Sequence, residues 1–424
     1  MKFLKILFFT LFLVFPFGQL GRIPLGEGEI VLQLNDLIIG FLIGYWVGWH
    51  FLKKERFVNP PFGKYIFFFF IIGLTSFLLN LPRWGFSLSG SLYLVRWTTY
   101  AGLYFFTSEL IFKKEISPGK IFRGLVLAGI AVGIFGIFQY FLYPDLRNLY
   151  YLGWDPHYYR VFSTFFDPTF TGMILVLTLI PLVIYLMEKK YTSVASLLCL
   201  IDGNYKDMFT KWWLIIAGAT VYTALALTYS RASYLAFLVG MGVIAYLKRS
   251  PKLFLITIAI FILTLVVLPK REDRIGSNLT REDTITARII NWKQSLQIIR
   301  DHPLFGVGFN NYRLVQRQDG FTVENEIVSH AAAGADSSLL FIWATTGFIG
   351  FLGFLWLWWN IGKVAWQSWW RSKSIYGLAL FSSLIALFFH SFFSNSLFYP
   401  WIMEWVWILA AIVSVDRVKS RYGE

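Results

Sequence analysis

The sequence predicts an all-α polytopic membrane protein with about twelve transmembrane helices and a large, partly helical loop between the ninth and the tenth. Three observations predict this fold class. The 424-residue chain is 57% hydrophobic and only 15% charged, whereas about 25% of the residues of a typical soluble domain are charged. Apolar stretches of roughly 17 to 25 residues, long enough to cross about 30 Å of hydrocarbon, recur along the chain. Aromatic residues make up 20% of it, and many Trp and Tyr lie at the ends of apolar stretches, as in interfacial belts.

The first apolar stretch, "MKFLKILFFTLFLVFPFGQLG", is predicted to remain in the protein as a helix. Lys2 and Lys5 precede its apolar part, as in a signal peptide, but no small-x-small cleavage site follows. Eleven further apolar stretches come after it. The twelve predicted spans are approximately 3–20, 30–51, 64–81, 90–112, 121–143, 168–187, 211–229, 232–248, 252–268, 338–361, 375–393 and 398–415.

The distribution of basic residues predicts the orientation of these spans. An even number of spans places both termini on one side of the membrane. If that side is the cytoplasm, the cytoplasmic segments carry most of the 38 Lys and Arg residues. This is the positive-inside pattern, and it accounts for the net charge of +14 without nucleic-acid binding. The basic residues of the short outer loops are Arg22, Arg83, Arg147, Arg160 and Arg231.

Two outer loops stand out, at about 144–167 and about 269–337, and the second is too long to be a plain connection. The second loop divides the chain into helices one to nine (1–268), the loop itself, and the last three helices with the tail (338–424). The apolar spacing in "TITARIINWKQSLQIIR" predicts a helix inside this loop that lies on the membrane surface or packs over the bundle. Its cap is predicted at Asp283 or Thr284, and Pro303 lies beyond its end. The predicted apolar stripe consists of Ile285, Ile289, Trp292, Leu296 and Ile299.

Arg231 stands between two predicted spans in "LTYSRASYLAFLVG", where almost no loop separates them. An arginine at the end of a membrane helix commonly extends its guanidinium to the interface, and this is the simplest interpretation. The neighbouring outer loop presents Arg160 in "YYRVFSTFFDPTFTG", for which a salt bridge to Asp155 or Asp167 is the alternative. Because a guanidinium makes two parallel bonds to phosphate oxygens, two arginines at one membrane mouth predict a site for an anionic headgroup.

Arg96, Asp36 and Glu404 lie inside predicted spans, each about six residues from the outer end, which is a depth of about 9 Å at 1.5 Å per residue. Charged residues inside a bilayer are costly, usually have a partner, and are candidates for a functional site. We therefore predict an ion-pair network beneath an outward-facing cavity, with Arg96 as a further anion ligand. A purely structural buried pair is the alternative.

His330 and Asp336 are the candidate general bases, in "VSHAAAGADSS" of the long loop. A neutral imidazole can remove a proton from an attacking hydroxyl, and a carboxylate can do the same. A lone loop histidine is often only a solvated residue. His157 and His390 are interpreted as structural.

An acidic pair in the first outer loop, Glu27 and Glu29 in "GEGEI", is the alternative that would hold a divalent ion through oxygen ligands. No further acidic cluster accompanies it in the sequence, and we predict no metal and no cofactor. The single cysteine, Cys199, excludes an internal disulfide and a cysteine-rich metal site. The absence of a Gly-rich phosphate loop argues against ATP-driven chemistry.

Four stretches of the sequence carry a family resemblance. "LTYSRASYLAFLVG" has a Ser-Arg that opens a span, and "RVFSTFFDP" has an arginine shortly before the sixth span. "ARIINWKQSLQIIRDHPLFGVGFNNYR" has the order Arg, Trp and His-Pro-Leu-x-Gly-x-Gly, and "DSSLLFIWATTGFIGFLGF" has a Gly-x-x-Gly. Together with the twelve spans and the long loop, these stretches resemble the O-antigen ligase and polymerase superfamily of bacterial membrane glycan transferases over most of residues 150–360.

The resemblance implies a GT-C-like fold and a metal-independent, inverting transfer at the periplasmic face of the bacterial inner membrane. It also implies a donor glycan on undecaprenyl pyrophosphate and an acceptor hydroxyl on lipid A–core or another glycan. Arg160 and Arg231, with Arg288 of the loop helix, match the arginines that hold the pyrophosphate in such enzymes. At the family's usual spacing from Gly347, this sequence has Asp336 in place of a histidine. His330 is therefore the preferred base, and Asp336 is the alternative.

Other functions remain open at this point. A polymerase would extend a lipid-linked chain, and a protein O-oligosaccharyltransferase would modify a polypeptide. A transporter or flippase would need charges along a midplane path and repeat symmetry, and no internal repeat is visible. The predicted partners are the lipid-linked donor, the acceptor and membrane lipids, with no nucleic acid. The predicted location is the bacterial inner membrane, with both termini in the cytoplasm.

Overall fold

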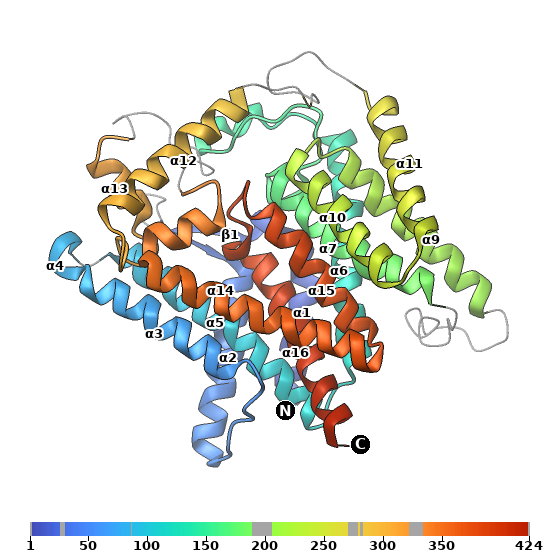
Figure 1. The fold of residues 1–424 in the computed structure, drawn as a ribbon, viewed down its shortest axis with the longest axis horizontal. Helices are drawn as coiled ribbons and strands as arrows, with labels where there is room; N and C mark the ends of the chain where they lie inside the picture. The colour runs from blue at the N-terminus through green and yellow to red at the C-terminus, as the bar shows by residue number, and fades with distance from the viewer. Residues whose placement is uncertain are drawn as a thin grey trace.

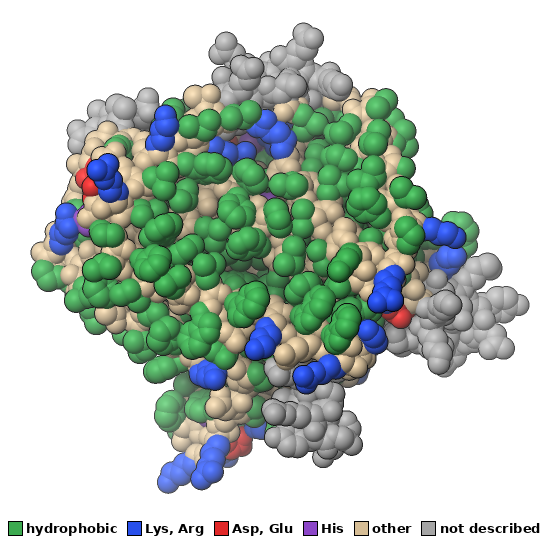
Figure 2. Space-filling model, in the orientation of Figure 1, with side chains coloured by type: hydrophobic (Ala, Val, Ile, Leu, Met, Phe, Trp, Pro, Cys, Tyr) green, Lys and Arg blue, Asp and Glu red, His purple; other side chains and the backbone are tan. Residues whose placement is uncertain are grey.

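The computed structural model is a bundle of helices with one small β-hairpin (Figure 1). It describes residues 2–25, 30–85, 87–188, 206–269, 279, 283–321 and 334–422. Both ends of the chain lie at one end of the bundle, and the helices of the long loop lie at the other, which is called the loop end below (Figure 1). Hydrophobic side chains cover most of the face drawn in Figure 2, as expected of a surface in contact with lipid, and Lys and Arg lie mainly toward its edges.

Each of the twelve predicted spans corresponds to one helix. The helices are α1 (Lys2–Val14), continued by the 3-10 helix η1 (Phe15–Gly21), α2 (Leu34–Lys53), α3 (Gly63–Leu79), α5 (Leu88–Phe112), α6 (Pro118–Leu142), α7 (Pro168–Met187), α9 (Lys206–Ala226), α10 (Arg231–Leu247), α11 (Pro251–Val267), α14 (Ser338–Ser372), α15 (Ile375–His390) and α16 (Pro400–Tyr422). Between them lie the short helices α4 (Leu81–Trp84), η2 (Arg147–Leu152), η3 (Ser163–Phe165) and η5 (Ser396–Phe398).

Apolar helices dominate the described part of the chain. Those long and apolar enough to cross a membrane, by length and composition, are Lys2–Gly21, Pro118–Leu142, Pro168–Met187 and Ser338–Ser372, and shorter apolar helices of 10–17 residues accompany them. The prediction of a mostly helical membrane protein is therefore confirmed. That twelve helices cross the membrane stays a prediction.

The second predicted span begins too early, because Ile30–Gln33 is a strand. This strand, β2, pairs antiparallel with β1 (Arg22–Leu25), with Arg22 opposite Gln33. The helix α2 then starts at Leu34, and its capping box explains the boundary. The Asp36 carboxylate accepts a hydrogen bond from the backbone N–H of Gln33 (2.8 Å), which satisfies a donor that the helix leaves unpaired.

The helices α7 and α16 form the centre of the bundle. Most residues of α7 are buried, and Trp401 to Val415 of α16 are buried throughout. A helix that is apolar on all sides either lies inside a protein or spans the membrane in contact with lipid, so burial, not apolarity, places these two helices at the centre. By contrast, Thr257 is the buried residue of α11, and this helix lies at the edge of the bundle (Figure 1).

The helix α14 is interrupted at Gly347, which has φ 68° and ψ −171°. The backbone of the segment around residues 303–308 in the long loop supplies the hydrogen-bond partners at this interruption. The N–H of Phe348 donates to the carbonyl oxygen of Pro303 (2.8 Å), and the N–H of Val307 donates to that of Ala344 (3.0 Å). Irregular backbone within an apolar bundle must find such partners inside the protein. The His-Pro-Leu-x-Gly-x-Gly and Gly-x-x-Gly stretches therefore form one structural unit.

The long loop contains α12 (Asp283–Asp301) and α13 (Tyr312–Gln318). The predicted loop helix is confirmed, and it packs against α14 over the bundle. The predicted apolar stripe is only partly buried against the bundle. Ile285, Ile289 and Leu296 are 45%, 45% and 52% exposed, whereas Ile299 is buried together with Ser295 and Ile298. That the exposed part of the stripe lies on the membrane surface stays a prediction.

Candidate functional site

The first residues of α7, α10 and α14 follow capping side chains at the loop end. The Asp167 carboxylate caps α7 by accepting hydrogen bonds from the backbone N–H groups of Thr169 (2.5 Å) and Phe170 (2.9 Å). Ser230 caps α10, and Ser337 caps α14. Because the first turn of a helix carries partial positive charge and spare N–H groups, helix N-termini favour an anion beside them.

Arg160 is a buried arginine, 5% exposed, in the segment before α7. Gln139 of α6 holds this segment in place, because its side-chain oxygen accepts hydrogen bonds from the N–H groups of Phe162 (2.9 Å) and Ser163 (3.0 Å). Tyr159 and Ser163 both have a φ of 49°. Residues other than glycine rarely adopt this conformation, and such local strain is concentrated at functional sites.

Arg160 lies against the turn that carries Arg231. The Nε of Arg160 donates a hydrogen bond to the carbonyl oxygen of Thr228 (2.9 Å). Arg231 follows three residues later as the first residue of α10, and its guanidinium donates to the carbonyl oxygen of Leu279 (3.3 Å). The structure thus places these two predicted anion ligands on neighbouring segments of the loop end.

Arg288 of α12 lies among the charged groups of the other segments. Its charge interacts with Arg231, Asp167 and Asp336, and Arg160 interacts with Asp167. Burial raises the pKa of Asp167, while its two N–H donors and the two nearby arginines oppose this rise. Figure 2 shows basic side chains gathered in the area between α12 and α10. The three arginines therefore belong to one electrostatically coupled group.

Asp336 lies just before the cap of α14 and is partly buried. Its N–H donates to the side-chain oxygen of Asn291 in α12 (2.8 Å), and the amide of Asn291 donates to the carbonyl oxygen of Gly334 (3.0 Å). Burial raises the pKa of Asp336 to about 6, although the Arg288 guanidinium opposes this rise. A carboxyl group that titrates close to neutral pH is suited to accept a proton during a reaction.

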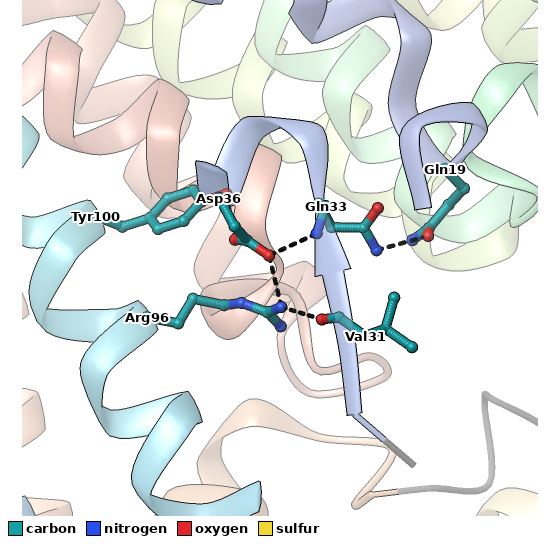
Figure 3. Close-up of polar contacts among 6 residues, drawn as sticks. All are labelled: Gln19, Val31, Gln33, Asp36, Arg96 and Tyr100. Carbon is teal, nitrogen blue, oxygen red and sulfur yellow. Dashed lines mark hydrogen bonds and ion pairs between the residues drawn. The ribbon is translucent and has the colours of Figure 1, made fainter. Parts of the chain in front are cut away.

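Arg96 of α5 forms an ion pair with Asp36 of α2, with 2.6 Å between Nη2 and Oδ2 (Figure 3). The same guanidinium nitrogen donates to the carbonyl oxygen of Val31 in β2 (2.5 Å), and the Tyr100 hydroxyl donates to Asp36 (2.9 Å). Of the predicted network of Arg96, Asp36 and Glu404, the structure shows the ion pair between Arg96 and Asp36; the outward-facing cavity and the role of Arg96 as an anion ligand stay predictions. Its two partners are on α2 and β2, so the contact fixes the hairpin to the bundle.

The network around this pair extends in two directions. Glu404 of α16 accepts a hydrogen bond from Asn35 (2.7 Å). Gln33 donates to the side-chain oxygen of Gln19 in η1 (2.8 Å; Figure 3). These polar contacts join α2 to α16 and the hairpin to η1.

His330, the preferred base, lies outside the described residues, and so do Glu27 and Glu29 of the alternative metal site. Among the residues that the structure does describe, no three His, Cys, Asp or Glu side chains are grouped as a metal ion would require.

Asp167 and Asn291 are site residues that the sequence-based prediction did not assign. Asp167 enters that prediction only as a possible partner of Arg160, and Asn291 does not enter it. A signal exists for each. The order Asp-Pro-Thr before an apolar run is typical of a helix cap, and Asn291 lies three residues after Arg288, so that both occupy one face of α12.

The comparison with protein families identifies the segment that carries most of this group. The family model described as O-antigen ligase matches residues 214–355, from α9 into α14. This segment of the chain therefore matches the O-antigen ligase family. No curated protein matches the chain.

The O-antigen ligase segment includes Arg231, Arg288 and Asp336, whereas Arg160 and Asp167 lie before it. The structure joins the two parts. Arg160 reaches the segment through the carbonyl oxygen of Thr228, and Asp167 interacts with Arg288.

Proposed function

We propose that this protein is a metal-independent, inverting glycosyltransferase that moves a glycan from undecaprenyl pyrophosphate to an acceptor hydroxyl, with lipid A–core as the acceptor. One observation carries the proposal: Arg160, Arg231 and Arg288 form one coupled group beside the partly buried carboxyl of Asp336. A pyrophosphate needs several cationic ligands, and an attacking hydroxyl needs a base. The match of residues 214–355 to the O-antigen ligase family supports the same reaction class.

The arginines act on the leaving group. As the bond between the anomeric carbon and the pyrophosphate oxygen breaks, negative charge grows on that oxygen. Guanidinium groups and helix N-termini that are already in place stabilise this charge without reorganisation. The loss of one such donor typically lowers the rate roughly 100- to 1000-fold.

The transfer is a single displacement. The acceptor oxygen forms a bond to the anomeric carbon from the face opposite the pyrophosphate, which inverts that carbon. The electron pair of the broken bond leaves on undecaprenyl pyrophosphate, and the acceptor proton passes to the base. We assign this base to Asp336, because its pKa of about 6 leaves it ionised at neutral pH and its contact with Asn291 fixes it beside Arg288.

The orientation follows from the charges. The positive-inside pattern places both termini in the cytoplasm, and the loop end is opposite them (Figure 1). The site would then face the periplasm of the inner membrane. Nucleotide sugars are cytoplasmic, so a lipid-linked donor is the substrate class that fits this side.

Reconstitution tests the reaction. Purified full-length protein would be mixed with a glycan on undecaprenyl pyrophosphate, once with lipid A–core and once alone. Glycan on lipid A–core is the expected product. Longer lipid-linked chains in the absence of lipid A–core would identify a polymerase, and no new glycosidic product in either mixture would contradict the proposal.

Two variants distinguish the candidate bases. Asp336→Asn is expected to lose most of the transfer activity, and His330→Ala is expected to keep it. The opposite result would assign the base to His330. Activity in EDTA is expected to match activity without it, whereas loss of activity in EDTA would revive a metal site at Glu27 and Glu29.

A further inference from the structure

His390 is a fully buried histidine at the end of α15, and both of its ring nitrogens have hydroxyl partners. Nε2 lies 3.3 Å from the Oγ of Ser233 in α10, and Nδ1 lies 2.6 Å from the Oγ of Ser396. Both serines are buried as well. Arg288, the central arginine of the candidate site, interacts with this imidazole through its charge.

The Ser233 hydroxyl joins the starts of two helices. It lies 3.1 Å from the carbonyl oxygen of Thr169, in the first turn of α7, and 2.8 Å from the Oγ of Ser230, the cap of α10. The two helices pack closely here: a Cβ atom on Gly172 of α7 would lie only 2.4 Å from the Ser233 hydroxyl. Ser233 thus fixes the start of α7, which follows Asp167, to the start of α10, which carries Arg231.

The turn after His390 holds the start of the third helix. The N–H of Ser338, in the first turn of α14, donates to the carbonyl oxygen of Ser391 (2.9 Å). The Ser338 hydroxyl accepts from the N–H of Leu397 (3.1 Å). Asp336 lies two residues before Ser338, so this turn contributes to its position together with the contact to Asn291. Ser396, which contacts His390, belongs to the same turn.

One arrangement of protons satisfies both ring nitrogens. If the Ser233 hydroxyl donates to the Thr169 carbonyl, its oxygen accepts from Nε2–H of His390. Nδ1 then accepts from the Ser396 hydroxyl. A neutral imidazole satisfies both partners at once. A leucine of similar volume would leave two buried hydroxyl groups without this partner, which is unfavourable in a dry interior.

We propose that His390 is a positioning residue that, through Ser233 and Ser396, sets the starts of α7, α10 and α14 relative to one another and thereby holds Arg231 and Asp336 in register around a pyrophosphate. The inference rests on the proposed function for the identity of the anion. His390 does not touch the substrate in this role.

The test uses full-length protein in lipid nanodiscs and inorganic pyrophosphate as the probe, with affinity measured by calorimetry. His390→Leu and Ser233→Ala are each expected to weaken pyrophosphate binding roughly tenfold, the equivalent of one lost buried hydrogen bond. The double variant is expected to lose less affinity than the sum of the two single losses, because the two residues share one contact. His390→Gln, which can keep one of the two hydrogen bonds, is expected to recover part of the affinity.

Ser383→Ala is the matched control. Ser383 is buried on the same helix, and within the described chain its hydroxyl has no hydrogen-bond partner. This variant is expected to bind pyrophosphate as the unmodified protein does. Wild-type affinity in His390→Leu, or additive losses in the double variant, would overturn the proposal and leave His390 as a structural residue.

Hydrogen–deuterium exchange provides a readout that does not depend on any ligand. His390→Leu is expected to speed the exchange of peptides that contain residues 167–172 and 230–234, and Ser383→Ala is not. If wild-type protein binds pyrophosphate but transfers no glycan, the proposed function fails while this inference stands on the affinities. If wild-type protein binds no pyrophosphate, exchange alone decides, and unchanged exchange in His390→Leu overturns the inference.

Discussion

Gly347 and Leu304 are in direct backbone contact: a Cβ atom on Gly347 would lie 2.1 Å from the Leu304 carbonyl oxygen. Gly306 is similarly confined, because its Cβ would lie 2.5 Å from the carbonyl oxygen of Ala344. Both glycines have positive φ angles. The two motifs that mark the family in the sequence are therefore the two sides of one contact. This contact sets the direction of the first part of α14, which begins just after Asp336.

Gly347→Ala is expected to disrupt the fold. The alanine would have to adopt a φ of 68° and displace backbone, not a flexible side chain, so we expect a loss of stability of roughly 3 kcal/mol or more. The measurement is the Tm and the yield of detergent-solubilised protein. Gly362→Ala, on the same helix, is the control, because nothing lies within 4 Å of its Cβ position; it is expected to be neutral or stabilising by about 0.5–1 kcal/mol. Equal effects of the two variants would contradict the role of the contact.

Arg288→Gln is expected to lower kcat roughly 100-fold or more, because it removes a fixed cation from the leaving group. The kcat of Arg288→Lys is expected to lie between those of Arg288→Gln and the unmodified protein, since a lysine keeps the charge but loses the planar pair of donors. Steady-state rates on a lipid-linked donor measure the effect. Arg300→Gln changes an exposed arginine of the same helix and should retain the activity of the unmodified protein. A comparable loss in Arg300→Gln would indicate a general electrostatic effect.

The rate of transfer is expected to fall as the pH drops below about 6. Burial raises the pKa of Asp336 to about 6, and its protonated form cannot act as a base. Because the Arg288 cation lowers this pKa, Arg288→Gln should move the acidic limb of the pH–rate profile to higher pH. A profile that stays level down to pH 5, or a limb that does not move in the variant, would argue against Asp336.

Asp336→Asn is expected to be more stable than the unmodified protein at neutral pH, although it is inactive. The folded-state pKa of about 6 exceeds the ordinary value of 3.8, so the folded protein binds the proton more tightly than the unfolded chain does. The free energy of unfolding therefore falls as the pH rises from about 4 through 6, by at most about 3 kcal/mol, because the carboxyl ionises less readily in the folded protein. Thermal melting at pH 7.5 measures the gain. Asp319→Asn, at an exposed position, serves as the control and should melt as the unmodified protein does.

Arg96→Leu is expected to destabilise the protein by roughly 3 kcal/mol, because it leaves the nearly buried carboxylate of Asp36 without its cation. The double variant with Asp36→Asn should recover much of this loss, since asparagine carries no charge and can still accept the N–H of Gln33. The Tm values of the single and double variants decide the matter. A double variant less stable than Arg96→Leu would show that the pair is not the source of the effect.

Local sequence patterns were sufficient to predict the helices. The length of each apolar stretch and the Pro or Ser residues at the starts of α6, α7, α10 and α11 are properties of neighbouring residues, so all of the predicted spans correspond to helices. The nearness of Arg160 and Arg231 was also predicted, because the scarcity of basic residues in the short outer loops is visible in the sequence, whereas Arg288 was named from the family resemblance alone.

Features that depend on distant partners were not predicted. The interruption of α14 depends on the backbone of residues 303–308. The strand β2 depends on its partner β1, so a prediction from hydropathy alone placed Ile30 in a helix. The apolar stripe of α12 was predicted from the residues of the helix alone, but which part of it is buried depends on the segments above which the helix lies, and Ser295 is buried beside Ile299. His390 was interpreted as structural because its partner Ser233 lies 157 positions away in the sequence.

The coupled group is assembled from segments that the ribosome makes in the order Arg160, Arg231, Arg288 and Asp336, with the turn after α15 last. A nascent chain that has inserted only as far as α11 holds two arginines of this group, no α12 and no Asp336. Under the proposed function it would lack the third cationic ligand and the base. The order of synthesis would thereby delay the proposed transfer until the last helices of the chain are in the membrane.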